Sequence, residues 1–147
     1  MNHKKSIVIL IADDDPDDRI MTQEALNDYN VINQVKSVED GIELLDYLRG
    51  NGKFKDPIEN PRPDLILLDL NMPKMDGRDA LKIIKSDPDL CRIPIIILTT
   101  SRSDIDVIES YDLGVNSFIS KPVTFTRFIE VIRAIGKYWF EIIQLPS

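Results

Sequence analysis

The sequence predicts a doubly wound α/β fold, in which a five-stranded parallel sheet is covered by helices on both faces. Two observations lead to this prediction. Continuous apolar runs such as IVILIA, LILL and PIIIL are typical of strands buried on both faces. These runs alternate with amphipathic segments over short links, and a β-α unit repeated five times favours a parallel sheet. The 147 residues suit one domain. We expect its core at about residues 6–137, with 138–147 extending the last helix.

The predicted strands differ in how apolar they are. Three of them show no polar alternation, which predicts burial on both faces of the sheet. The second is less apolar, and we expect it nearer an edge. The predicted strands cover residues 6–12, 31–38, 65–68, 94–98 and 117–120.

Helices are expected after each strand. Asp15 is a suitable N-cap for the first of them. In the second, Ile42, Leu45 and Leu48 lie on one apolar stripe. Residues 51–63 contain prolines and glycine-flanked turns and are predicted to be a surface loop. The predicted helices begin at residue 16 and cover 39–49, 77–85, 103–113 and 124–143.

Composition argues against several classes of protein. With 25 acidic and 18 basic residues the net charge is −7, which disfavours binding to nucleic acid or to an anionic membrane. No apolar run approaches the roughly 18 residues of a membrane span, and no signal peptide is visible. A single cysteine and a single histidine, Cys91 and His3, cannot build an internal disulfide or a thiolate or imidazole metal cage. We therefore expect a cytoplasmic protein.

Polar side chains follow the predicted strands at their carboxyl ends. Asp13 and Asp14 follow the first strand, Asp69 the third, Thr99 the fourth and Lys121 the fifth. Right-handed crossovers bring these strand ends to one edge of the sheet, where ligands bind in open α/β folds. Singly, each residue has a plain structural explanation as a helix cap, a turn residue or a solvated lysine. Their joint position favours a functional site.

The side chains expected at this edge suit phosphoryl transfer. Carboxylates without imidazole or thiolate partners are ligands for a hard cation, Mg²⁺ first, and the cation relieves their mutual repulsion. A carboxylate beside Mg²⁺ can accept a phosphoryl group. The ammonium of Lys121 and the hydroxyl of Thr99 are suited to neutralise and hydrogen-bond the phosphoryl oxygens.

These motifs resemble those of response-regulator receiver domains of two-component signalling. The shared pattern is the acid pair after IVILIA, LLDLNMPKMDG around Asp69, Thr99 after PIIIL, and the Lys121-Pro122 pair. With the WFEIIQLP ending, the chain resembles most the small regulators that partner bacterial phytochromes. The resemblance implies a flavodoxin-like (βα)5 fold with strand order 2-1-3-4-5.

The resemblance also implies a role for each acid at the site. It makes Asp69 the phosphoacceptor. It has the carboxylates of Asp14 and Asp69 and the backbone carbonyl of Asn71 bind Mg²⁺, which Asp13 reaches through water.

The remaining roles concern signalling within the domain. By resemblance, Lys121 pairs with the phosphoryl group, and Thr99 hydrogen-bonds that group and couples it to a rotamer switch at Phe118. The alternative for Phe118 is a plain core residue. The switch residue of this family is more often Tyr. A phenylalanine there has no hydroxyl to hydrogen-bond in the inward state.

We expect a stand-alone response regulator that accepts its phosphoryl group from a separate sensor histidine kinase and signals by protein contact. About 20 residues after Lys121 form the last predicted helix and then the chain stops, which leaves no space for a DNA-binding module, and His3 is the only histidine. The alternative is a Mg²⁺-dependent aspartyl-phosphate phosphatase, disfavoured because Asn71 stands where such enzymes usually have a second Asp. A flavodoxin-like cofactor binder is disfavoured because the acidic first turn, ADDDPDD, would repel the phosphate of FMN.

The last predicted helix is more apolar than it needs to be to cover a sheet. An exposed aromatic patch near its end would be unusual for a monomer. We expect a homodimer through this helix and the strand 117–120, although the tail could instead fold back onto its own domain. One broad stripe comprises Phe125, Phe128, Ile129, Ile132, Ile135, Trp139, Ile142 and Ile143, and Val131, Tyr138 and Phe140 lie outside it.

Overall fold

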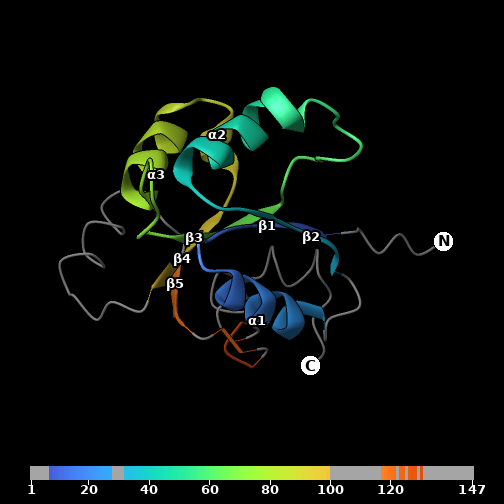
Figure 1. Ribbon diagram of the computed structural model, residues 1–147, viewed down its shortest axis with the longest axis vertical. Helices are drawn as coiled ribbons and strands as arrows, with labels where there is room; N and C mark the ends of the chain where they lie inside the picture. Colours follow the sequence, from blue (N-terminus) through green and yellow to red (C-terminus); the bar gives the residue numbers. More distant parts are fainter. Residues whose placement is uncertain are drawn as a thin grey trace.

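Five parallel strands form one sheet in the order β2-β1-β3-β4-β5 (Figure 1). The computed structural model describes residues 7–27, 32–99, 117–121, 123–124, 126–128 and 130. The predicted fold class and strand order are confirmed, and the less apolar second strand lies at an edge as expected. The strands are β1 (Ile7–Ala12), β2 (Ile32–Val38), β3 (Leu65–Asp69), β4 (Ile95–Thr99) and β5 (Ser117–Ser120).

Helices cover both faces of this sheet. Figure 1 shows α2 (Gly41–Arg49) and α3 (Gly77–Ser86) together on one face and α1 (Pro16–Asn27) on the other. Alternate residues of β1 enter two separate cores, since Ile9 packs on the α1 side and Leu10 on the α2 and α3 side.

The strand register brings the carboxyl ends of the strands level with one another. Ala12 pairs with Leu68, so the next residues, Asp13 and Asp69, leave β1 and β3 side by side. On the other side of β3, Thr99 pairs with Ser120, the residue before Lys121. One edge of the sheet therefore collects the residues that follow four different strands.

Side-chain caps fix where the helices begin. The backbone amides of Asp17 and Asp18 donate to Oδ1 of Asp15 at 2.9 and 3.4 Å, so Asp15 is the predicted N-cap of α1. The second helix begins at Gly41, two residues later than predicted, because the side chain of Asp40 caps it by accepting from Glu43 N at 2.8 Å.

The apolar stripe predicted for α2 is wrong at one position. The buried side chains of this helix are Leu44, Leu45 and Tyr47, whereas Ile42 is 45% exposed. Ile42 lies on the outer side of the first turn, which packs through the glycine before it. The amide of Gly41 donates to the carbonyl of Met75, and a Cβ on Gly41 would collide with that carbonyl.

The loop over residues 51–63 is predicted correctly as a loop, but it is anchored at several points. It contains a 3-10 turn, η1 (Gly52–Phe54), and a second such turn, η2 (Leu90–Arg92), lies beyond α3. The Tyr47 hydroxyl donates to the carbonyl of Pro61 at 2.9 Å. Arg62 donates to the side chain and the carbonyl of Asp89 at 2.8 and 3.0 Å.

Several predicted elements lie outside the described residues. These are the helix over 103–113, most of the helix over 124–143, the extension 138–147, and with them the predicted dimer surface. Residues 126–128 and 130 are helical, and the side chain of Phe128 is buried in the core on the α1 side. Within the part of the chain that is described, no helix is both long and apolar enough to cross a bilayer.

Candidate functional site

The acids after β1 and β3 meet at the carboxyl edge of the sheet. The strand order makes this the topological switch point, where open α/β sheets bind ligands. Asp13 is fully buried, Asp69 is 5% exposed and Asp14 is exposed. One carboxylate oxygen from each of the three lies within 4.8 Å of the others.

Lys121 lies in the middle of these acids. Its Nζ is 2.7 Å from Oδ2 of Asp13, 2.9 Å from Oδ2 of Asp69 and 3.1 Å from Oδ2 of Asp18. The Lys121 side chain is 7% exposed. Burial alone would lower the pKa of this ammonium, but its contacts with Asp13 and Asp69 outweigh that effect and raise the pKa. Lys121 is therefore charged at neutral pH.

The carboxylate of Asp13 lies in surroundings that disfavour its charge. Burial raises its pKa, and the charge of Asp69 raises it further, against the opposing effects of Lys121 and the Asp15 amide. Its Oδ1 accepts from Asp15 N at 3.0 Å. Its Oδ2 is buried and lies 2.7 Å from the Lys121 ammonium, with which it forms an ion pair. A buried carboxylate oxygen in this state fits a site for a hard cation.

The backbone around Asp69 is held by short-range contacts. Oδ1 of Asp69 accepts from Asn71 N at 3.1 Å. The amide of Gly77, the first residue of α3, donates to the carbonyl of Leu70 at 2.8 Å. A Cβ at Gly77 would collide with the carbonyl of Asp69 and lie 2.7 Å from Cα of Leu70. Glycine at this position thus lets α3 begin directly against the end of β3.

The same loop contains one unusual backbone conformation. Lys74 has φ = 64°, in the left-handed region that few residues other than glycine adopt. The amide of Met75 donates to the carbonyl of Pro73 at 2.7 Å across this turn. The turn brings the Met75 carbonyl to the amide of Gly41, so the loop after Asp69 contacts the start of α2.

Two predicted site residues are placed only in part. Thr99 ends β4 and its backbone pairs with Ser120, but its side chain lies outside the description. Phe118 lies in β5, is half-buried and packs against the core on the α2 and α3 side. The coupling between Thr99 and Phe118 therefore stays a prediction.

Sequence reasoning missed two residues of this edge, Asp18 and Arg19. Asp18 contacts Lys121, and Arg19 Nη1 donates to the backbone carbonyl of Asp13 at 2.8 Å. The sequence carried no signal that singles out Asp18, because five acids surround the start of the first helix and all of them suit a helix N-terminus.

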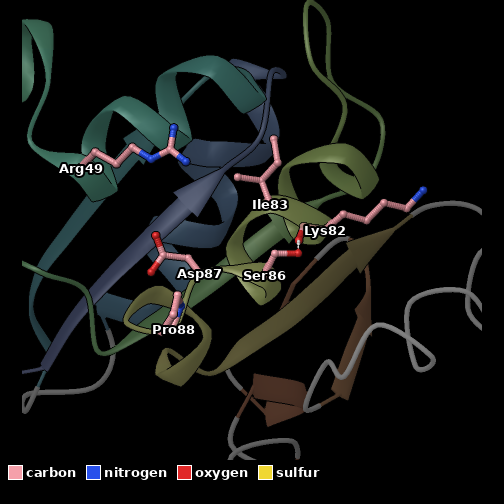
Figure 2. A pocket seen from close by; sticks show the side chains of 6 residues that line it. All are labelled: Arg49, Lys82, Ile83, Ser86, Asp87 and Pro88. Atoms are coloured by element: carbon pink, nitrogen blue, oxygen red, sulfur yellow. Dashed lines mark hydrogen bonds between the residues drawn. The ribbon is translucent and has the colours of Figure 1, made fainter.

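A separate groove of about 440 Å³ lies away from this edge, between the ends of α2 and α3 (Figure 2). Figure 2 shows the side chain of Lys82 pointing away from that of Arg49. None of the predicted site residues borders the groove. Its lining residues are Arg49, Lys82, Ile83, Ser86, Asp87 and Pro88.

Comparison with known proteins gives a family match over most of the chain. Residues 9–133 match the family described as the response regulator receiver domain. The response regulator Rcp1 of Synechocystis sp. is 39% identical over 140 residues, which is 95% of this chain and 93% of that protein.

Two solved structures are similar in both fold and sequence. The phosphorylated cyanobacterial phytochrome response regulator RcpA is 42% identical, with a TM-score of 0.77 over 97% of this chain and 99% of that one. The Mn²⁺-bound form of Rcp1 is 39% identical, with a TM-score of 0.74 over 96% of this chain and 99% of that one.

Proposed function

This chain belongs to the response-regulator receiver domain family, and from that premise we propose that it accepts a phosphoryl group on Asp69 from a sensor histidine kinase. The transfer depends on Mg²⁺, and the phosphorylated domain signals by contact with another protein in the cytoplasm. The observation that carries the proposal is the buried cluster of Asp13, Asp69 and Lys121, whose charged atoms lie 2.7 and 2.9 Å apart at the carboxyl edge of the sheet.

The side chain of Asp69 performs the transfer. One of its carboxylate oxygens forms the new bond to phosphorus while the bond from phosphorus to the donor's histidine nitrogen breaks. Mg²⁺, held by Asp14, Asp69, the Asn71 carbonyl and, through water, Asp13, would neutralise charge on the phosphoryl oxygens. The close grouping of the Asp13, Asp14 and Asp69 carboxylates supports a cation here, as does the Mn²⁺-bound structure of Rcp1.

Lys121 binds the phosphoryl group once it is on Asp69. Its ammonium is a point charge on a flexible stem, so it can leave the Asp69 oxygen for a phosphoryl oxygen. The Thr99 hydroxyl then hydrogen-bonds the phosphoryl group and changes the rotamer preference of Phe118. This step links phosphorylation to the surface around β5.

Two partners are proposed, a kinase inferred from the family and a second copy of this chain inferred from the apolar residues over 124–143. The kinase is of the phytochrome type, as the likeness to RcpA supports. The domain forms a homodimer through the helix over 124–143, where the apolar residues exceed one face of a helix. The net charge of −7 supports a protein partner and not nucleic acid.

Incubation with a small phosphodonor tests this function against the phosphatase alternative. With acetyl phosphate and Mg²⁺ the protein should take up at most one phosphoryl group per chain, and chelation of Mg²⁺ should abolish the uptake. It should not hydrolyse p-nitrophenyl phosphate, because no second acid stands at position 71. Rapid multiple turnover of that ester would favour the phosphatase, and absence of any uptake would contradict the proposal.

A further inference from the structure

Lys121 has a third carboxylate partner that comes from a helix and not from a strand end. Asp13 and Asp69 leave β1 and β3, whereas Asp18 lies in the first turn of α1. Its Oδ2 accepts from the Lys121 ammonium at 3.1 Å. The side chain of Asp18 is 28% exposed, against 0% for Asp13 and 7% for Asp69, so it is the outermost of the three partners.

The other positive group nearby has partners of its own. The guanidinium of Arg19 donates to the carbonyl of Asp13 at 2.8 Å and lies 3.5 Å from Glu39. Among the described residues, Lys121 is the cation that contacts Asp18. The Asp15 cap fixes the turn that presents Asp18.

A divalent cation and the ammonium compete for the same oxygens. The acid group of Asp13, Asp14 and Asp69 is the candidate cation site, and Lys121 already holds an oxygen from two of these three residues. The two positive charges repel each other strongly at such short range in a partly buried site. The cation therefore binds well only if the ammonium has another carboxylate to turn to.

We propose that Asp18 is a positioning residue, which holds the Lys121 ammonium while Asp13 and Asp69 turn to a divalent cation. This inference rests on the proposed function, because it takes the cation at the acid edge as given. Asp18 does not bind the metal. It acts through Lys121, so that α1 contributes to the affinity of the site and keeps the ammonium ready for the phosphoryl group.

A double-mutant cycle separates this role from a simple effect of charge. Asp18→Asn should weaken Mg²⁺ binding about threefold to tenfold in calorimetry, the size typical of coupled network residues. In a Lys121→Met background the same substitution should have almost no effect, because no ammonium remains to be held. Asp17→Asn is the matched control: it removes one exposed charge from the same turn, and among the described residues no ion pair or hydrogen bond joins Asp17 to Lys121.

A second readout needs only Asp18→Asn and does not depend on the Lys121 variant being folded. In protein labelled with ¹⁵N-lysine, the Lys121 ammonium protons should exchange with water slowly in the Mg²⁺-bound wild type. In Mg²⁺-bound Asp18→Asn the exchange should be at least about threefold faster, since the ammonium has lost its remaining carboxylate partner.

The outcomes distinguish this inference from the proposed function. Equal weakening by Asp18→Asn in both backgrounds, equal weakening by Asp17→Asn, or unchanged ammonium exchange would overturn the positioning role alone. A wild-type protein that binds no Mg²⁺ would overturn the proposed function, and this inference with it.

Discussion

The ammonium of Lys121 lies 2.9 Å from a carboxylate oxygen of Asp69, although the two residues stand at the ends of different strands. Asp69 ends β3, Lys121 follows β5, and β4 lies between those strands in the sheet. The long lysine side chain therefore reaches across the edge to a buried acid. This contact balances the negative charge of Asp69 when no metal is bound. A phosphoryl group on Asp69 would instead bind the Lys121 ammonium through one of its own oxygens.

Removal of this ammonium should destabilise the metal-free protein. Lys121→Met leaves Asp13 and Asp69 buried without their cation, which should cost about 1–3 kcal/mol of unfolding free energy. Saturating Mg²⁺ should recover most of this loss, because it supplies positive charge to the same oxygens. Urea unfolding with and without Mg²⁺ measures both effects.

The control for this prediction is Lys74→Met. The Lys74 side chain is 69% exposed and lies 3.7 Å from a carboxylate oxygen of Asp40, so its loss should matter little. Equal losses for the two variants, or a Lys121→Met protein indifferent to Mg²⁺, would count against the cluster as described.

Gly77 should be intolerant of even one extra carbon. Gly77→Ala forces the end of β3 and the start of α3 apart, which should cost about 1–3 kcal/mol by overpacking. Because Asp69 is displaced with its carbonyl, the rate of phosphorylation by acetyl phosphate should fall as well. Gly52→Ala is the control, since nothing lies within 4 Å of its Cβ and only its φ of 58° is unfavourable. A Gly77→Ala protein with normal stability and normal rate would refute this explanation.

The ion pair between Glu43 of α2 and Lys53 of the loop over 51–63 should show a defined pH dependence. Burial raises the pKa of Glu43, but Lys53 at 2.7 Å and the Glu39 amide at 2.9 Å lower it more, so the net pKa lies below the usual 4.5. The folded state therefore favours the charged form. The stabilisation is present above pH 4.5 and is lost as the pH falls through the lower, folded value.

Glu43→Gln should accordingly be less stable than wild type by about 0.5 kcal/mol at neutral pH. The difference should vanish in acid and shrink in high salt. Chemical unfolding at several pH values measures it, with Glu59→Gln as an exposed control on the same loop. A difference that persists below the folded pKa would show that packing and not charge is responsible.

The dimer proposed for the C-terminal helix can be tested by truncation. A chain ending at Lys137 loses Trp139, Phe140 and the apolar residues beyond them. It should remain folded and sediment with a larger monomer fraction than the full chain, because part of the apolar contact is gone. A folded truncation that is as dimeric as the full chain would rule out this surface.

The three central strands, β1, β3 and β4, were predictable to within a residue or two because each is buried in a parallel sheet. Such strands must be apolar on both faces, so runs such as IVILIA and LILL end where the chain reaches solvent. The same reasoning placed Asp13, Asp69 and Lys121 at one edge, since the carboxyl ends of parallel strands have no other place to meet.

The sequence could not predict contacts that depend on the path of a loop or on which side of a helix faces the core. The bond from Tyr47 to Pro61 depends on how the loop returns, and the outward position of Ile42 depends on the close approach at Gly41. Asp18 was hidden among five acids that all suit a helix N-terminus. Only the position of Lys121 distinguishes it from the other acids of that turn.

The central claim is that Asp69 alone receives the phosphoryl group, and the direct measurement is to locate that group. Protein treated with acetyl phosphate and Mg²⁺ is reduced with borohydride, which converts an acyl phosphate to an alcohol, and is then mapped by tandem mass spectrometry. The reduced residue should be at position 69 in wild type and absent without Mg²⁺. Asp69→Asn should show none while melting at the same or a higher temperature, because it relieves the repulsion among the acids. Reduction at Asp13 or Asp14, or continued labelling of Asp69→Asn, would contradict the account.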